Sequence, residues 1–130
     1  MDQTMAVGAV PTVDIVEDDE AVRDSFAALL EASGIETRSF GSAEDYLAAR
    51  ESSRGDCLLL DLNLPGMSGL DMLEQLRAEG DDLPTMIITA RRSPQAVERA
   101  RRADALAVFD KPIDRQALLA AIRDVFHLLA

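Results

Sequence analysis

Short apolar runs alternate with amphipathic stretches along nearly the whole chain. A run that is mostly apolar and stops abruptly at a charged or turn-forming residue is typical of a buried parallel strand. Five such runs are present: Thr12–Glu17, Ile35–Phe40, Asp56–Asp61, Pro84–Thr89 and Leu106–Phe109. The alternation predicts five strands, each followed by a helix.

The stretches after these strands have apolar residues at helical spacing. Ser42 is the predicted N-cap of a second helix, Ala43–Arg50, and Ser93 followed by Pro94 predicts the start of a fourth. The apolar faces of the first, third and fifth helices consist of Val22, Phe26, Leu29 and Leu30, of Leu70, Leu73 and Leu76, and of Leu118, Ile122, Val125 and Leu129.

Five βα units in succession predict an α/β fold, with a five-stranded parallel sheet that is doubly wound and covered by helices on both faces. The length of 130 residues suits one domain, which we expect over residues 11–130, preceded by a flexible leader over residues 1–10. In such sheets the site lies beyond the carboxyl ends of the strands. The residues that directly follow the strands are therefore the candidate site.

Chemically capable side chains follow four of the five predicted strands. Each one alone is more often a turn former, a helix cap or a solvated side chain, but their coincidence at four strand ends favours one shared site. The residues are Glu17 and Asp18, Asp61 with Asn63, Thr89, and Lys111, which is the only lysine of the chain.

The acidic members of this set indicate a metal ion. Two like charges about 4 Å apart repel by about 4 kcal/mol at an effective dielectric of about 20, and a divalent cation removes that cost. Ligands that are all oxygen favour Mg²⁺. We expect Asp18 and Asp61 to bind Mg²⁺ directly, Glu17 to hold a metal-bound water, and the backbone carbonyl of Asn63 to supply a further oxygen.

Asp61 is also the best candidate nucleophile. A carboxylate can attack phosphorus and form an acyl phosphate if the developing charge is neutralised. Mg²⁺ would neutralise one phosphoryl oxygen and Lys111 a second, and the hydroxyl of Thr89 could donate to a third.

Composition narrows the classes of partner. The formal net charge of -11 disfavours direct binding to nucleic acid or to an anionic membrane. The single cysteine, Cys57, lies in an apolar strand and fits a core residue of a protein in the reducing cytoplasm. No apolar stretch approaches the roughly 20 residues of a membrane span.

Four stretches of the chain resemble a response-regulator receiver domain of the CheY-like superfamily. They are VDIVEDDEAVR, LLLDLNLPGMSG, MIITA and FDKP, and the resemblance extends from Val10 to Leu129. The segment SFGSAEDYL is similar to the FixJ-type branch, whose members often carry a C-terminal LuxR-type helix-turn-helix. The resemblance implies a flavodoxin-like sheet with strand order 2-1-3-4-5.

The resemblance also implies roles at matching positions. Asp61 matches the phosphoacceptor, Glu17 and Asp18 match the acidic pair that binds magnesium, Thr89 matches the switch hydroxyl, and Lys111 matches the family lysine. Such a domain is a phosphoacceptor switch that catalyses only its own phosphorylation and slow dephosphorylation, and it is not a general enzyme.

Three further positions bear on this comparison. Pro112 matches a proline that the family holds after a cis peptide bond. The family commonly has an aromatic residue three positions before the lysine, where this chain has Val108, and Phe109 should point to the opposite face. A switch that couples the threonine to an aromatic residue is therefore not implied here.

The implied partner is a sensor histidine kinase that docks near the first helix. The family often uses the fourth helix, fifth strand and fifth helix for homodimers or effectors, and this region has a local cluster of arginines. DNA would be bound only through a separate output domain. The cluster consists of Arg91, Arg92, Arg99, Arg101 and Arg102.

Three alternative functions remain to be weighed. The domain could be a stand-alone phosphorelay or partner-binding receiver without DNA-binding output. A magnesium-dependent phosphohydrolase with an aspartate nucleophile usually has a second acid two residues after the nucleophile, where this chain has Asn63. A flavin binder needs a phosphate-binding loop after the first strand, whereas the acidic run Glu17 to Glu20 would repel phosphate.

Overall fold

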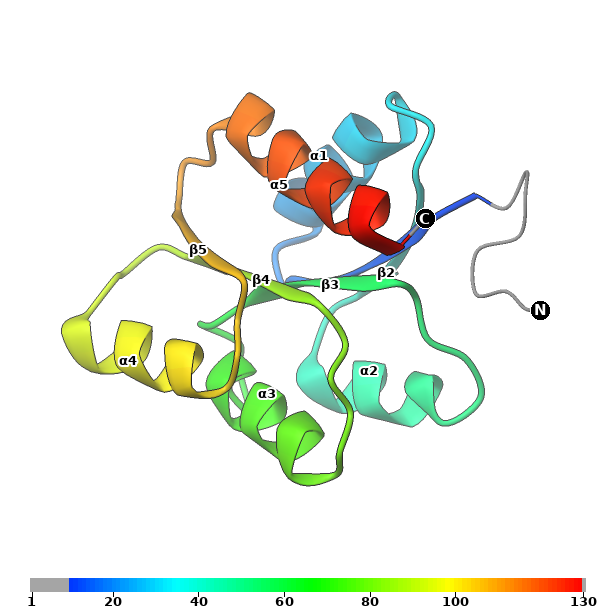
Figure 1. The fold of residues 1–130 in the computed structure, drawn as a ribbon. Coiled ribbons are helices and arrows are strands. Elements are labelled where there is room, and N and C mark those ends of the chain that lie inside the picture. Colours follow the sequence, from blue (N-terminus) through cyan, green and yellow to red (C-terminus); the bar gives the residue numbers. More distant parts are fainter. Residues whose placement is uncertain (1–9, 130) are drawn as a thin grey trace.

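A parallel sheet runs through the centre of the molecule, between two layers of helices (Figure 1). The structure is a computed structural model that describes residues 10–129, without the side chains of residues 128 and 129. The predicted leader, apart from Val10, and the side chain of Leu129 lie outside the described residues. The elements are β1 (Thr12–Val16), α1 (Glu20–Glu31), β2 (Glu36–Phe40), α2 (Ala43–Arg50), β3 (Cys57–Asp61), α3 (Gly69–Ala78), β4 (Thr85–Thr89), α4 (Pro94–Arg102), β5 (Ala107–Asp110) and α5 (Arg115–Leu129).

The strands lie in the order β2-β1-β3-β4-β5, and all neighbours are parallel. The predicted fold class and strand order are confirmed, and the predicted strand ends differ from the observed ones by at most one residue. The strand order reverses between β1 and β3, where Val16 pairs with Leu60. The residues that follow these two strands therefore begin side by side at one edge of the sheet.

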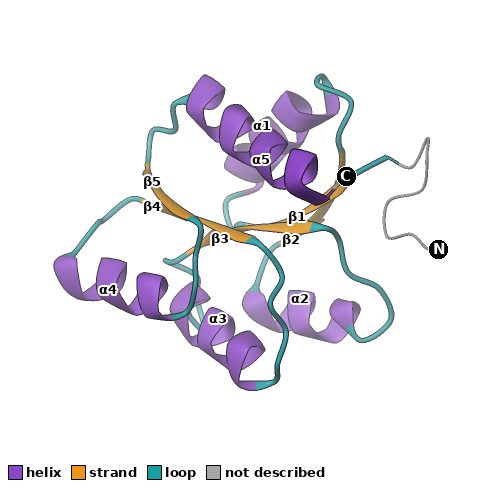
Figure 2. Ribbon diagram, in the orientation of Figure 1, coloured by secondary structure: helices purple, strands orange, loops and turns teal. Residues whose placement is uncertain are grey.

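The two helical layers bury two separate apolar clusters. Helices α1 and α5 cover one face of the sheet, and α2, α3 and α4 cover the other (Figures 1 and 2). Alternation along the strands divides the side chains: Val13 and Ile15 pack toward α1 and α5, whereas Val16 packs toward the other layer. Val108 and Phe109 likewise belong to opposite clusters, as predicted.

Side-chain caps fix where the helices begin. Ser42 accepts a hydrogen bond from the backbone N–H of Asp45 at 3.0 Å, and Ser93 accepts one from Ala96 at 3.0 Å. Both predicted N-caps are confirmed. Asp19 caps α1 in the same way, so the acidic run after β1 turns directly into a helix.

Among the helices of residues 10–129, none has the length and apolar character that a membrane crossing requires.

Candidate functional site

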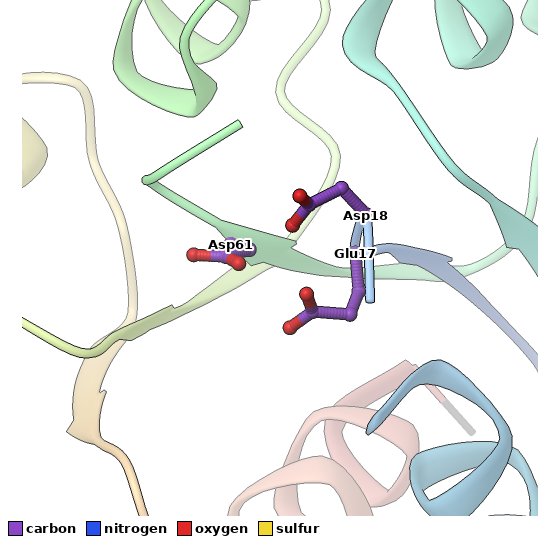
Figure 3. Close-up of side chains that lie close together, drawn as sticks. All are labelled: Glu17, Asp18 and Asp61. Carbon is purple, nitrogen blue, oxygen red and sulfur yellow. The ribbon is translucent and has the colours of Figure 1, made fainter. Parts of the chain in front are cut away.

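Three carboxylates meet at the edge of the sheet where the strand order reverses. Glu17 and Asp18 follow β1, and Asp61 is the last residue of β3 (Figure 3). One carboxylate oxygen from each lies within 4.8 Å of the others. Glu17 and Asp61 are 0% and 2% exposed, whereas Asp18 is exposed. The cluster therefore opens to solvent on the side of Asp18.

Lys111 joins two of these acids from the opposite end of the chain. Its Nζ donates to Glu17 Oε1 at 2.7 Å and to Asp61 Oδ2 at 3.1 Å. Burial disfavours the ammonium ion, but the two hydrogen bonds outweigh burial, and the pKa of Lys111 is raised. Lys111 therefore stays charged, and it offsets part of the repulsion among the carboxylates.

Glu17 is held on three sides. Besides Lys111, the backbone N–H of Asp19 donates to Oε2 at 3.0 Å, and Arg23 Nη1 donates to the backbone carbonyl of Glu17 at 2.7 Å. Burial raises the pKa of Glu17 even though the bonds from Lys111 and Asp19 oppose this shift. The charged form is therefore costly at this position, which favours a nearby cation.

Both oxygens of Asp61 already accept a hydrogen bond. The backbone N–H of Asn63 donates to Oδ1 at 2.9 Å, and Lys111 donates to Oδ2. These two contacts, one from the loop after β3 and one from the loop after β5, fix the plane of the carboxylate. Each oxygen keeps a further lone pair for a metal or a reacting atom.

Thr89 is tied to the loop after β3 rather than to the carboxylates. The side-chain amide of Asn63 donates to Thr89 Oγ1 at 3.2 Å. The backbone N–H of Arg91 donates to the same hydroxyl oxygen at 3.1 Å, and the hydroxyl donates to the carbonyl of Arg91 at 3.1 Å. Thr89 is 1% exposed, so its hydroxyl is held in a defined place beside the site.

The structure thus brings the predicted residues to one edge of the sheet. Glu17, Asp18, Asp61 and Lys111 lie together, and Thr89 is linked to them through Asn63. Three carboxylates with all-oxygen donors fit a hard divalent cation such as Mg²⁺ better than zinc. The peptide bond between Lys111 and Pro112 is cis, as the resemblance implied.

Sequence reasoning missed two supporting residues. Arg23 lies on α1 and holds the backbone of Glu17. Glu44, in the first turn of α2, accepts a hydrogen bond from the backbone N–H of Met67 in the loop after β3. The predicted N-cap Ser42 put Glu44 in the first turn of the second helix, but no sequence signal indicated which loop its side chain would contact.

The predicted arginine cluster is largely neutralised by acids. Arg92 pairs with Asp110, Arg99 pairs with Asp71 and Glu74 of α3, and Arg101 and Arg102 pair with Glu98. The cluster is therefore largely paired within the chain: the arginines are close in sequence, and the fold places carboxylates among them.

A groove of about 440 Å³ lies between α1 and the residues after β5. Its apolar lining includes Val22, Phe26 and Leu29 of α1 together with Pro112 and Ile113, and it reaches Lys111 at the site. An apolar surface thus borders the carboxylate cluster.

Comparison with known proteins agrees with this geometry. The family of response regulator receiver domains matches residues 13–123. The transcriptional regulatory protein FixJ of Azorhizobium caulinodans is 38% identical over 112 residues, which cover 85% of this chain and 53% of the relative. The sensory transduction protein RegX3 of Mycolicibacterium smegmatis is 40% identical over 113 residues, covering 87% and 49%. The chain spans about half the length of these curated relatives.

Solved structures share the fold. The response regulator StyR superposes with a TM-score of 0.84 at 40% identity, covering 93% of this chain and 61% of that one. A CheY-like receiver domain protein from Methanospirillum hungatei has a TM-score of 0.83 at 29% identity, covering 88% and 92%. Sequence, fold and the arrangement of residues after the strands agree, and the chain belongs to the family of response regulator receiver domains of two-component systems.

Proposed function

We propose that the chain is a phosphoacceptor switch in which Asp61 takes a phosphoryl group from the phosphohistidine of a sensor kinase. The observation that carries the proposal is the double contact of Lys111 Nζ with Glu17 and Asp61, beside the exposed Asp18. This arrangement provides a nucleophile, a fixed positive charge and a set of oxygen ligands at one place.

The reaction forms a P–O bond to a carboxylate oxygen of Asp61 and breaks the P–N bond of the phosphohistidine. The electron pair of that bond goes to the imidazole nitrogen, which takes a proton from solvent. Asn63 and Lys111 orient the Asp61 carboxylate, and the ammonium of Lys111 stabilises negative charge on the phosphoryl oxygens. Thr89 would donate to another oxygen after leaving its contacts with Asn63 and Arg91.

The same proposal includes Mg²⁺ held by Asp18, Asp61, Glu17 and the carbonyl of Asn63. When bound, the ion supplies charge neutralisation for the carboxylates and for a phosphoryl oxygen. The exposure of Asp18 gives a cation and its waters access from solvent.

The groove beside α1 supports docking of the kinase. Phosphoryl transfer requires the donor imidazole to reach Asp61, and the lining of the groove includes Lys111, which contacts Asp61. Val22, Phe26 and Leu29 offer an apolar surface to a partner helix. With such a kinase as partner, we propose that the chain acts in the cytoplasm.

For the output we propose that phosphorylation changes the surface formed by α4, β5 and α5, and so controls homodimerisation. FixJ is named a transcriptional regulatory protein and is about twice as long as the matched region. Transcription would then be controlled through a LuxR-type output domain in a longer protein. A stand-alone relay or partner-binding receiver is the alternative output.

A general phosphohydrolase is less well supported. Asn63 occupies the position of that class's second acid, and its side chain is engaged with Thr89. The chain would therefore catalyse only its own phosphorylation and slow dephosphorylation.

Acetyl phosphate with Mg²⁺ tests the assignment. We expect one phosphoryl group to be added, as measured by intact-protein mass spectrometry. The addition should be blocked by chelation of Mg²⁺ and lost in Asp61→Asn, while the matched exposed variant Asp82→Asn should be labelled normally. Labelling that persists in Asp61→Asn would refute the assignment.

Lys111→Ala separates binding from switching. The variant should still bind Mg²⁺, because the carboxylates remain. Its phosphorylation should no longer change the conformation of α4 or cause dimerisation. Phosphorylation-dependent dimerisation equal to wild type, measured by analytical ultracentrifugation, would contradict the role of Lys111.

A further inference from the structure

Helix α2 reaches across to the loop that joins β3 to α3. Glu44 Oε2 accepts a hydrogen bond from the backbone N–H of Met67 at 3.0 Å. It also lies so close to Gly66 that a Cβ placed on this glycine would come within 2.7 Å of it. Gly66 has φ +72, a conformation that disfavours other residues. The carboxylate of Glu44 is therefore fitted against the loop backbone.

This loop, residues 62–68, is held near both of its ends as well as through Asn63. At its base, the backbone N–H of Gly69 donates to the carbonyl of Leu62 at 3.2 Å. Toward its far end, Glu44 provides the side-chain contact. Between the two attachments lies Asn63, whose N–H holds Asp61 Oδ1 and whose side chain holds Thr89.

We propose that Glu44 is a positioning residue for the metal and phosphoryl site, acting through the β3–α3 loop on Asn63. The inference rests on the proposed function, because it concerns the same site. Without the acceptor on Glu44, the part of the loop beyond Asn63 keeps the bond at its base and the packing of Leu64 and Met67, but it loses its hydrogen bond to α2. Asn63 then samples more conformations, and the orientation of Asp61 and any oxygen ligand on the loop become less defined.

The chemistry of the contact supports its persistence in solution. The bond from Met67 lowers the pKa of Glu44, so the side chain is ionised at neutral pH. A hydrogen bond from a backbone N–H to an ionised carboxylate is stronger than one to a neutral acceptor. Glu44 also lies in the first turn of α2, whose start is fixed by the N-cap Ser42.

Three variants isolate the contact. Glu44→Ala removes the acceptor and one charge, Glu44→Gln removes the charge and keeps a carbonyl acceptor, and Asp45→Ala removes one charge from the next residue of the same helical turn. Both acids are exposed, so each variant should fold. Comparison of the three separates the hydrogen bond from general electrostatics.

The first measurement is hydrogen exchange of the Met67 amide by NMR. Because Glu44→Ala removes the acceptor that protects this amide, exchange should be roughly 5-fold faster in Glu44→Ala and near wild type in Asp45→Ala. Unchanged protection in Glu44→Ala would overturn the inference.

The second measurement is Mg²⁺ affinity by NMR titration, without phosphodonor. We expect about 3-fold weaker binding in Glu44→Ala, and binding within about 1.5-fold of wild type in Glu44→Gln and Asp45→Ala. Equal weakening in all three variants means that charge alone acts, and the inference fails. If the wild-type chain bound no Mg²⁺, the proposed function itself would fail, whatever the Met67 exchange showed.

Discussion

At the scale of single residues, one ion pair of residues 10–127 outside the site has a fully buried carboxylate. Asp14 lies in the middle of β1 and is 0% exposed. Arg38 of β2 donates to its two oxygens at 2.8 and 3.1 Å, and the backbone N–H of Gly55 donates to Oδ2 at 2.7 Å. The carboxylate is thus fully engaged, which is the condition for keeping a charge inside a protein.

Removal of one partner should be costly. Arg38→Met leaves the buried carboxylate of Asp14 without its counter-charge, and we expect a loss of about 3 kcal/mol in the free energy of unfolding. Arg101→Met is the matched control, because Arg101 pairs with Glu98 at the surface and its loss should change the free energy of unfolding little. Urea denaturation measures both, and equal losses would contradict the argument.

Cys57 provides a second test at this scale. Its thiol is buried in β3, and burial raises the pKa of Cys57 to about 12. The folded protein at pH 8 then holds roughly one thiolate in ten thousand molecules, so thiol reagents should not label it. Labelling should stay slow up to about pH 10 and become rapid in urea. Fast stoichiometric labelling of the folded chain at pH 8 would show that the Cys57 thiol is accessible to solvent and would contradict its burial in β3.

At the scale of elements, α4 is held mainly by polar contacts. Within the helix only Ala100 is buried, so little apolar area anchors it. Two arginines connect it to α3 in different ways. Arg99 pairs with exposed acids of α3, whereas Arg77 of α3 donates to the carbonyl of Ala103 at 2.7 Å and to those of Asp81 and Leu83.

These two arginines should differ in their contribution to stability. Arg77 satisfies several carbonyls that would otherwise lose a partner, and we expect Arg77→Met to cost about 2–4 kcal/mol. Arg99→Met should cost less than about 1 kcal/mol, because its ion pairs are exposed. Thermal melts of both variants give the comparison, and a larger effect of Arg99 would contradict it.

The elements themselves were predictable to a large degree. Periodicity located all five strands and five helices, because short apolar strands and amphipathic helices leave distinct patterns. The small errors lie at the strand ends, where hydrogen bonding to a neighbouring strand decides the boundary. Glu17, for example, was placed in the first strand, but the strand ends at Val16.

At the scale of the whole molecule, charge is the dominant feature. The chain has a net charge of -11, and three of its carboxylates converge on one small site. Such crowding opposes folding unless a cation is present. A bound divalent cation would relieve the repulsion that Lys111 does not offset.

Mg²⁺ should accordingly stabilise the folded chain. At ten times the dissociation constant the gain is about 1.4 kcal/mol, or a rise of roughly 5 °C in Tm. Asp18→Asn should abolish most of this rise by removing a proposed metal ligand, and NaCl at matched ionic strength should not reproduce it. An equal rise with NaCl would indicate general screening instead of a site.

The sequence by itself determined the class of fold, the strand order through family resemblance, and the set of residues at the strand ends. These follow from local patterns and from the rule that carboxyl ends of parallel strands share one edge. The contacts of Arg38 with Asp14, of Glu44 with Met67, and of the arginines of α4 with acids came only from the tertiary structure. Long polar side chains can reach many partners, and three-dimensional packing alone decides which one lies within hydrogen-bond distance.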